Sequence, residues 1–366
     1  MKNKNKKKVI IAMSGGIDSS VAAALLKKQG YNVIGVFMRF WSQGGRDCFL
    51  ESEKRARSAA GKIGIPFYVF NLEKKFKKKV VDCFLKSSKS GLTPNPCVVC
   101  NKEIKFGLLF KKLKSLNADY IATGHYARIK TQNSKLKTQN HNLKLKTFKL
   151  LKGRDKNKDQ SYFLWKLDQK ILRKTLFPVG DYAKPEIRRL AKKFKLFPGH
   201  VPESQEICFV KNNINDFLKK YLKTKPGLII NRKEKVLGRH QGLWFYTIGQ
   251  RKGIGLAGGP YYVLDKDIKR NLLIATNNKK DLDKKELFVK NLNWISGKAP
   301  KFPLKVRVKI RSQHKPASAL LVNNICVKPG LTQSKVRFNK PQRAVTSGQS
   351  AVFYEKNELL GGGVII

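Results

Sequence analysis

A short glycine-containing stretch near the amino terminus has the residue types of a phosphate-binding loop. The apolar run 9–13 leads into Ser14-Gly15-Gly16, after which Asp18 and Ser19 open an Ala/Leu-rich segment. This order predicts a buried strand, a tight turn and a helix start. Glycines let a backbone turn sharply close to a ligand, and the free N–H groups of a helix start favour phosphate. No lysine follows the glycines, so the stretch is not a Walker P-loop.

Two cysteines follow a proline-rich approach in TPNPCVVCNKEIKF. Cys97 and Cys100 have C-x-x-C spacing, which in a reducing compartment indicates metal or redox chemistry. Asn101 has the residue type of a helix N-cap, so we expect Cys100 just ahead of a helix, with Lys102 nearby. Both features would lower the pKa of the Cys100 thiol below its free value of about 8.5. A closed zinc site is not expected, because there is no second C-x-x-C and the histidines are scattered.

The other cysteines carry weaker signals. Cys208 lies in the apolar run ICFV, and a lone cysteine in such a run is more often a core residue than a catalyst. Cys48, Cys83 and Cys326 have no chemical context around them, and we interpret them as structural. A role for Cys208 therefore needs evidence from elsewhere in the chain.

The elements that must position these residues alternate between strand-like and helix-like segments over the first ~190 residues. This alternation predicts a doubly wound parallel sheet, whose ligands bind at the carboxyl ends of the strands. The glycine loop, Met38 and Gly124 all fall at such ends. We expect this α/β domain over 1–205, a small β-rich central domain over 206–282 and a carboxyl-terminal β-barrel over 283–366. Residues 130–146 are lysine-rich and predict a solvated loop or a long hairpin.

The composition is strongly basic. Lys+Arg 78 against Asp+Glu 24 gives a net charge of 78 − 24 = +54. A charge of that sign favours a polyanionic partner, with nucleic acid ahead of membrane, although compositional drift toward lysine explains part of it. No apolar run approaches 18 residues, and the amino terminus runs directly into the first strand, so neither a membrane span nor a signal peptide is expected. We therefore expect a cytoplasmic protein.

The segment LKVRVKIRS alternates apolar and basic residues. Period two would put Lys305, Arg307, Lys309 and Arg311 on one face of a strand. Such a face suits contacts to RNA phosphates, and it equally suits a plain solvated surface.

Several blocks resemble one known family when they are taken together and in order. SGGIDSS, FMRFW, TPNPCVVCNKEIKF, ATGHYAR, KDQSYFLW, LFPVGDYAKPEIR, SQEICFV, HQGLWFYTIGQRKGIG, PQRAVTSGQSAVFY and LLGGGVI resemble the bacterial tRNA-specific 2-thiouridylases. The first block resembles the PP-loop of ATP pyrophosphatases. The match runs from residue 8 to the carboxyl end and implies a PP-loop ATPase domain, a central domain and a β-barrel that together hold a tRNA anticodon stem-loop.

The resemblance also implies site residues. It makes Cys100 the catalytic nucleophile and Cys208 the persulfide carrier, with a disulfide between them in the reaction. It puts the ATP site at Ala12, Met13, Ser14, Gly15, Gly16, Ile17, Asp18, Ser19, Met38 and Gly124. It puts the target base at Asn95, Pro96 and Cys97, and further tRNA contacts at His125, Lys158, Asp159, Gln160, Arg311, Ser312 and Gln349.

The implied chemistry is ATP-dependent 2-thiolation of the wobble uridine. ATP, with Mg²⁺ implied by its phosphates, adenylates the C2 oxygen, and a cysteine persulfide then supplies sulfur. The implied partners are tRNAs for Glu, Gln and Lys and a persulfide donor protein. Some family members carry Asp at the position of Cys97, so the general base stays unassigned here. An iron–sulfur cluster on Cys97, Cys100 and Cys208 is an alternative, as are a PP-loop ligase or amidotransferase acting on a small molecule and a non-catalytic RNA-binding protein.

Overall fold

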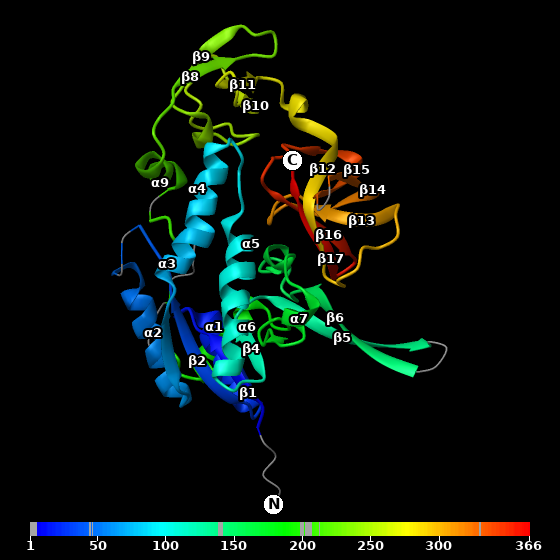
Figure 1. Cartoon of the computed structure of the whole chain (residues 1–366). Helices are drawn as coiled ribbons and strands as arrows, with labels where there is room; N and C mark the ends of the chain where they lie inside the picture. Colours follow the sequence, from blue (N-terminus) through cyan, green and yellow to red (C-terminus); the bar gives the residue numbers. More distant parts are fainter. Residues whose placement is uncertain are drawn as a thin grey trace, which may run out of the picture.

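The computed structural model describes residues 6–43, 45, 47–137, 142–197, 201, 207–211, 213–328 and 331–366. In these residues the chain forms a parallel α/β sheet, a small four-stranded sheet and a closed barrel, which follow one another along the sequence (Figure 1). This arrangement confirms the predicted fold class. None of the helices in the described ranges is long and apolar enough to cross a membrane.

The first unit is built on a five-stranded parallel sheet in the order β3-β2-β1-β4-β7. Its strands are β1 (Lys8–Ala12), β2 (Asn32–Arg39), β3 (Phe67–Asn71), β4 (Tyr120–Thr123) and β7 (Thr175–Leu176). The central strand β1 is apolar at successive positions because both of its faces are covered. Val9 and Ile11 pack into one core and Ile10 into the other, as the alternation of side chains along a strand requires.

Helices cover both faces of this sheet, which makes it doubly wound. One face carries α1 (Ile17–Lys28), α2 (Asp47–Ile63) and α8 (Lys184–Lys193). The other face carries two helical stretches, each with a π-helical turn. The first joins α3 (Glu73–Phe76), η1 (Lys77–Val81) and α4 (Asp82–Lys89), and the second joins α5 (Pro96–Cys100), η2 (Asn101–Phe106) and α6 (Gly107–Ser115). The second stretch, called the cysteine helix below, carries Cys97 and Cys100.

The lysine-rich insert belongs to a long antiparallel hairpin. β5 (Ala127–Lys137) pairs along its whole length with β6 (Asn142–Lys152), and the hairpin projects from the body of the molecule (Figure 1). Residues 138–141 lie outside the described ranges. At its base, Leu150 of β6 pairs with Leu359 of the barrel, so the hairpin joins the first unit to the last. The short elements η3 (Ser161–Leu164) and α7 (Gln169–Leu172) follow it.

The middle unit is small. After α9 (Ile214–Tyr221), it forms a four-stranded sheet in the order β10-β11-β8-β9, from β8 (Gly227–Ile230), β9 (Val236–His240), β10 (Tyr262–Asp267) and β11 (Leu272–Thr276). The short helices η4 (Leu243–Phe245) and η5 (Lys279–Leu282) flank the last two strands in sequence. Val263, Leu273 and Ala275 are fully buried in this unit.

The last unit is a barrel, closed because β12 pairs with both β15 and β17. Its strands are β12 (Asp283–Trp294), β13 (Leu304–Lys309), β14 (Ala317–Lys328), β15 (Leu331–Arg343), β16 (Ser350–Glu355) and β17 (Glu358–Ile365). Closure leaves no free edge among these strands. Their inward side chains form a core of their own.

The predicted face of four cations on the basic strand is confirmed only for the exposed Lys305 and Arg307. Lys305 and Arg307 are exposed, but Lys309 is only 9% exposed, and its ammonium lies 6.0 Å from the centre of the Tyr162 ring. Arg311 lies beyond the end of β13 and donates a hydrogen bond to the Ala344 carbonyl. Side chains two residues apart share a face only within the strand, which ends at Lys309, so Arg311 does not follow the alternation. Lys309 is buried because Tyr162 packs over it.

Candidate active site

The glycine loop is a strained turn that only glycine fits. The loop joins β1 to α1, and Gly15 has a φ of +76°. A Cβ atom at Gly15 would lie 2.0 Å from the Ser52 carbonyl oxygen of α2, so the backbone there has no room for a side chain. The Arg55 guanidinium donates to the Gly15 carbonyl at 3.2 Å and holds this turn from α2. The loop is therefore pre-formed.

Serine hydroxyls fix the rest of the loop from within. The Ser14 amide donates to Ser19 Oγ at 3.1 Å, and Ser19 Oγ donates to the Gly16 carbonyl at 3.1 Å. Gly16 is the extended N-cap residue, and α1 begins at Ile17. The amide groups at this helix start point out of the sheet edge, where a phosphate can bind.

The predicted ATP residues meet at one edge of the sheet. Because β2 and β4 flank β1, Met38, the glycine loop and Gly124 all lie at the carboxyl ends of adjacent parallel strands. A Cβ at Gly124 would lie 2.7 Å from the Ser19 amide nitrogen, so a glycine is needed where β4 touches the start of α1. Met38 is 8% exposed and packs mainly into the core.

Asp18 is anchored by two residues that the sequence analysis did not single out. Lys184 Nζ lies 2.6 Å from Asp18 Oδ1, and the Tyr126 hydroxyl donates to the same oxygen at 2.8 Å. The Lys184 side chain is 8% exposed, and that of Asp18 is 33% exposed. Lys184 lies in the block LFPVGDYAKPEIR, but nothing local in that block indicates a partner 166 positions away.

The helix that carries Cys100 begins earlier than predicted. Asn95, not Asn101, is the N-cap, and its side chain accepts a hydrogen bond from the Val98 amide at 3.4 Å. Cys100 therefore lies inside the helix and is only 6% exposed. Burial raises the pKa of the Cys100 thiol to about 12, and the positive charge of Lys105 only partly offsets that effect. The expected lowering of this pKa is thus wrong, because the thiol sits away from the helix start and away from water.

The thiols of Cys97, Cys100 and Cys208 are near enough for their charges to act on one another. Cys97 and Cys208 each raise the pKa of the Cys100 thiol through their charge, and Cys97 does the same to Cys208. Phe209 positions Cys208 by packing edge-on against Phe76 and Phe84. In the apolar run ICFV, the residue buried in the core is Phe209, whereas Cys208 is exposed.

Cys208 is accessible although protein atoms crowd it. Its side chain is exposed, yet desolvation by the surrounding atoms raises the pKa of its thiol to about 11. The pKa of the Cys97 thiol is also raised by burial. Lys105 lies near all three thiols and near His125, and its charge lowers the pKa of each of these four groups. Lys105 was not singled out from the sequence.

We expect Cys208 to react with iodoacetamide at a rate that rises about tenfold per pH unit from pH 7 to pH 9, without levelling off. Only the thiolate reacts, and a thiol with a pKa of about 11 is still mostly protonated at pH 9. Mass spectrometry of the peptide that contains Cys208 measures the rate. A plateau near pH 9, as a free thiol with a pKa of about 8.5 would give, would contradict the raised pKa.

The barrel holds the segment that leads into the cysteine helix. The Thr93 amide donates to the Ser347 carbonyl, and Gln349 Nε2 donates to the Thr93 carbonyl, each at 2.9 Å. The Tyr162 hydroxyl donates to the Ser350 carbonyl at 2.9 Å and also hydrogen-bonds Asn95. Gln349 and Asn95 are thereby brought together, and the barrel sets the position of the cysteine helix.

The structure does not present His125 for direct RNA contact. His125 is 8% exposed, its ring packs against both Phe106 and Phe177, and its Nδ1 lies 2.8 Å from the Thr123 hydroxyl. Burial holds its pKa well below the usual range, so the imidazole is neutral at pH 7. The tRNA contact expected at His125 stays a prediction, and in this conformation the residue packs against Phe106 of the cysteine helix.

The Lys158–Gln160 segment is likewise ordered by internal bonds. Gln160 Oε1 accepts from the Tyr126 amide at 3.0 Å, and Asp159 Oδ1 accepts from the amides of Gly153 and Ser161, each at 3.1 Å. Lys158 is half-buried. Ser312 is also half-buried, directly after Arg311. Asp159 and Gln160 therefore shape a loop and are not free to read RNA through these atoms.

The described cysteine, histidine and acidic side chains do not gather around a metal position. Among the described residues, no three Cys, His, Asp or Glu side chains form a group that could hold one. Cys97, Cys100 and Cys208 thus do not form a cluster cradle in this conformation. At the glycine loop, Asp18 is bound by Lys184 and Tyr126, so Mg²⁺ there would depend mainly on oxygens of the nucleotide.

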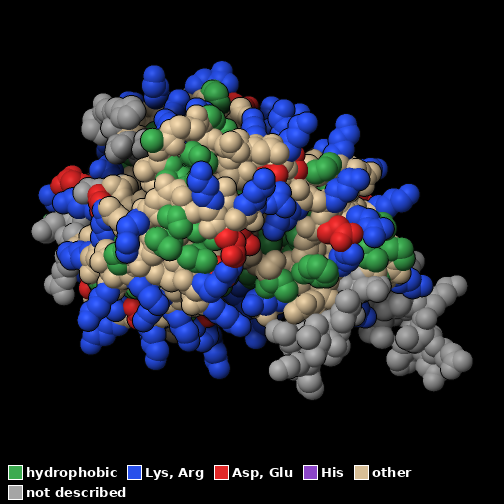
Figure 2. Space-filling view, turned by 90° about the horizontal axis from the view of Figure 1, so that it is seen from above, with side chains coloured by type: hydrophobic (Ala, Val, Ile, Leu, Met, Phe, Trp, Pro, Cys, Tyr) green, Lys and Arg blue, Asp and Glu red, His purple; other side chains and the backbone are tan. Residues whose placement is uncertain are grey.

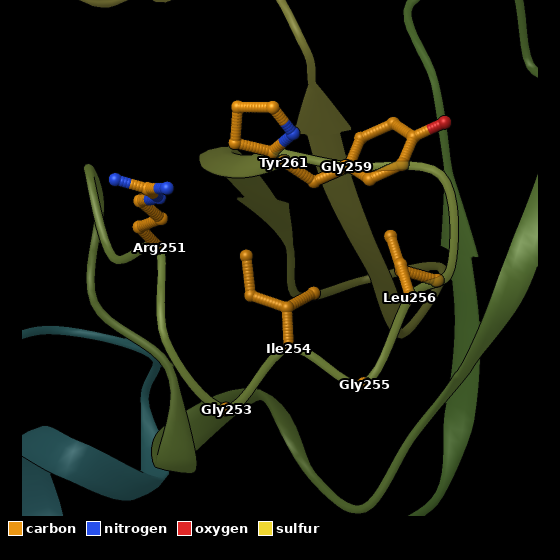
Figure 3. Close-up of a pocket in the computed structure, with 8 residues that line it drawn as sticks. Arg251, Gly253, Ile254, Gly255, Leu256, Gly259 and Tyr261 are labelled. Carbon is orange, nitrogen blue, oxygen red and sulfur yellow. The ribbon is translucent and has the colours of Figure 1, made fainter.

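Two surface features lie outside the predicted site. On the face seen from above, Lys and Arg side chains outnumber the acids; most of them lie around the rim and some near the middle (Figure 2). A pocket of about 350 Å³ opens in the glycine-rich loop of the middle unit, with Arg251 over one side and Ile254, Leu256 and Tyr261 around it (Figure 3). It contains none of the predicted site residues.

Comparisons with known proteins cover almost the entire chain. Three family models match in order: the tRNA methyl transferase HUP domain over residues 7–212, the tRNA methyl transferase PRC-barrel domain over 215–276 and the aminomethyltransferase beta-barrel domain over 284–365. Similar relatives are named tRNA-specific 2-thiouridylase MnmA. That of Clostridioides difficile is 44% identical, that of Carboxydothermus hydrogenoformans 42% and that of Clostridium perfringens 41%, each over 98% of both chains. The domain descriptions name methyl transfer, whereas these full-length relatives are named for thiolation.

Proposed function

Since the chain belongs to the family of tRNA-specific 2-thiouridylases, it is a tRNA sulfurtransferase, and we propose that it replaces the C2 oxygen of the wobble uridine with sulfur in two steps. ATP first adenylates that oxygen at the glycine loop. A persulfide on Cys208 then delivers the sulfur. The reaction is assigned from the names of the full-length relatives and not from the domain descriptions, because each relative matches this chain over 98% of both lengths.

The observation that carries this proposal is that the charge of Lys105 acts on two groups of residues. Its charge acts on Cys97, Cys100 and Cys208 and also on His125, which directly follows Gly124 of the ATP edge. The Gln43 amide, in the loop after β2, also donates a hydrogen bond to the Phe209 carbonyl at 3.5 Å. This bond ties the segment that carries Cys208 to the end of the parallel sheet. An adenylated base could therefore reach the thiols without leaving the protein.

The proposed first step makes the C2 oxygen a leaving group. The oxygen attacks the α-phosphate of ATP, pyrophosphate departs, and the glycine loop and the start of α1 hold the polyphosphate. Bound Mg²⁺ would neutralise phosphate charge. Ala12 to Ser19, Met38 and Gly124 are the proposed ATP contacts, and Lys184 keeps Asp18 in place beside them.

The proposed second step transfers one sulfur atom. The terminal sulfur of the Cys208 persulfide attacks C2, and AMP leaves with the original oxygen. The Cys100 thiol then attacks Cys208 Sγ, so a Cys100–Cys208 disulfide forms and the electron pair stays on the sulfur bound to C2. A dithiol reductant must reduce this disulfide before the next turnover. Because burial keeps both thiols protonated, we assign Lys105 the role of stabilising the thiolate as it forms.

The proposed RNA contacts lie around the start of the cysteine helix. Asn95, Pro96 and Cys97 would meet the target base, while Lys158, Arg311, Ser312 and Gln349 would contact or frame the anticodon stem-loop. A wobble base in a single-stranded loop can turn into such a pocket at low cost. We further propose tRNAs for Glu, Gln and Lys as substrates and a persulfide-carrying protein as the sulfur donor.

The test is sulfur incorporation into a tRNA transcript with ATP and a persulfide donor, read by nucleoside mass spectrometry. We expect 2-thiouridine to form, together with AMP and pyrophosphate. The matched control is the same tRNA with cytidine at the wobble position, which should yield no thiolated nucleoside. Equal product from both tRNAs would overturn the assignment of the wobble uridine.

A further inference from the structure

A second pocket lies toward the other end of the cysteine helix. It has a volume of about 420 Å³ and opens where α6, β6 and α7 meet. Its lining includes Phe110 of α6, Lys146 and Phe148 of β6, Lys170 of α7, and Arg173 and Lys174 just after α7. None of these residues belongs to the ATP site or to the thiol group. Phe110 follows Cys100 by ten residues, which is about 15 Å along a helix.

The charge of this pocket has one sign. Its four basic side chains have no ion pair within the described part of the chain, and no acid lines the pocket. Two acids are near these cations: Asp168 precedes Lys170 in the sequence, and Asp119 is affected by the charge of Lys174. Both carboxylates accept hydrogen bonds from backbone amides outside the pocket. Asp168 caps α7 by accepting from the Ile171 amide at 2.8 Å, and Asp119, which senses the charge of Lys174, accepts from the Lys8 amide at 2.9 Å. The pocket therefore attracts anions.

Aromatic rings stand beside these cations. The Lys170 ammonium lies 5.4 Å from the centre of the Phe110 ring, and the Lys146 ammonium lies 5.9 Å from that of Phe148. Both rings are partly exposed. Gln169 fixes the backbone of Phe148 on both sides, because its side chain accepts from the Phe148 amide at 2.9 Å and donates to the Phe148 carbonyl at 2.8 Å. The Phe148 ring and the Lys146 ammonium therefore lie side by side on a strand whose backbone is fixed by Gln169.

We infer that this pocket binds a nucleotide unit of an RNA strand, with an unpaired base stacked on Phe110 or Phe148 and the flanking phosphates on Lys170, Arg173 and Lys174. Aromatic faces that receive bases, together with cations that follow the backbone, are the two parts of a single-strand binding site. Four cations exceed the charge of one nucleoside monophosphate, whereas a strand brings a new phosphate with every residue. The inference rests on the proposed function: with the wobble base at Cys100, this pocket on the same helix would be a second contact with the tRNA.

The test compares tRNA affinity and its salt dependence in full-length variants. We expect K170A/R173A/K174A to weaken binding of a full-length tRNA transcript by at least about tenfold at 0.15 M salt and to make the slope of log K against log salt less negative by about 2. The matched control R189A/K192A/K193A removes one Arg and two Lys that are exposed on α8, and it should change neither quantity as much. F110L/F148L keeps the apolar bulk and should cost roughly fivefold or more.

A second probe separates the strand from a free nucleotide. Cytidine 5′-diphosphate, which lacks the adenine of ATP, is titrated into the wild type and the triple variant. Weak binding of this probe that disappears in the triple variant, together with the loss of tRNA affinity, supports the inference. If the triple variant and the α8 control bind tRNA with the same affinity and salt slope, an RNA site in this pocket is overturned, whatever the probe does. Inactive cysteine variants with normal tRNA affinity leave the inference standing, so the two proposals fail separately.

Discussion

Cys100→Ala is expected to lower the yield of 2-thiouridine by at least about 10³-fold while tRNA binds as it does to the wild type, because the variant lacks the thiol that attacks the Cys208 sulfur. Cys208→Ala should cause a loss of similar size, since it removes the persulfide carrier. Both are measured by nucleoside mass spectrometry after incubation with ATP and a persulfide donor. Binding is measured in parallel by fluorescence anisotropy with labelled tRNA.

The chain offers a matched control for both cysteines. Cys83 is an exposed free thiol on α4, and Cys83→Ala should keep wild-type activity. Because Cys100 is packed in the core, the melting temperature of Cys100→Ala must also be recorded, so that unfolding is not mistaken for lost chemistry. A folded Cys100→Ala or Cys208→Ala protein with wild-type activity would remove that cysteine from the mechanism.

Asp18→Ala should lower the rate of AMP formation by roughly 10²-fold or more, with tRNA affinity unchanged. Asp18 is held by Lys184 at 2.6 Å and by the Tyr126 hydroxyl at 2.8 Å, so its removal lets the start of α1 and the Lys184 side chain shift, and shifts of about 1 Å cost that much. It also removes the hydrogen-bonded carboxylate from the buried Lys184 ammonium, which should lower the free energy of unfolding by about 2 kcal/mol. Rapid-quench assays of AMP release and thermal melts measure the two effects.

Lys184→Met separates position from charge. This substitution removes the buried cation but leaves the Tyr126 bond to Asp18, so AMP formation should fall less than in Asp18→Ala if the carboxylate acts directly at the ATP site. If Lys184→Met is as damaging as Asp18→Ala, the ion pair acts as a unit and positions the loop. An unchanged rate of AMP formation in Asp18→Ala would refute the assignment of the PP-loop.

Local patterns predicted the parts of the fold that depend on local physics. The apolar run 9–13 became the central strand β1 because a strand covered on both faces must be apolar throughout. The Ser14-Gly15-Gly16 turn followed from the conformational freedom of glycine, and its φ of +76° at Gly15 confirms that need. The lysine-rich insert proved to be a hairpin, one of the two forms expected for it.

Predictions that depended on distant packing failed. The thiol of Cys100 was expected to ionise easily, but the helix begins at Pro96 and the core covers the sulfur, so its pKa rises to about 12. Lys309 belongs to a basic stripe in the sequence, yet it is buried against the first unit. In each case the burial comes from segments far away in the chain, which a local pattern does not contain.

The hydrogen-bond partners of the site residues could not be predicted either, because they lie far away in the sequence. Asp18 and Lys184 meet across 166 positions, and Gln349 reaches Thr93 across 256. Residue type and local spacing single out Asp18 and Gln349 as candidate site residues. Their hydrogen-bond partners are brought to them only by the folding of the chain. Lys105 is one lysine among many in the sequence, and in the folded chain it is distinguished by its charge, which acts on three thiols.

In the proposed mechanism, one site couples adenylation of the wobble uridine to transfer of a single sulfur from Cys208. The most direct measurement is a single turnover with protein loaded with radiolabelled sulfur as the Cys208 persulfide, in the presence of ATP and tRNA and without further donor. We expect 2-thiouridine, AMP and pyrophosphate to form in equal amounts, the label to move from Cys208 to the tRNA, and a Cys100–Cys208 disulfide to remain. Labelled 2-thiouridine formed without ATP, or AMP formed in full while the label stays on Cys208, would contradict this mechanism.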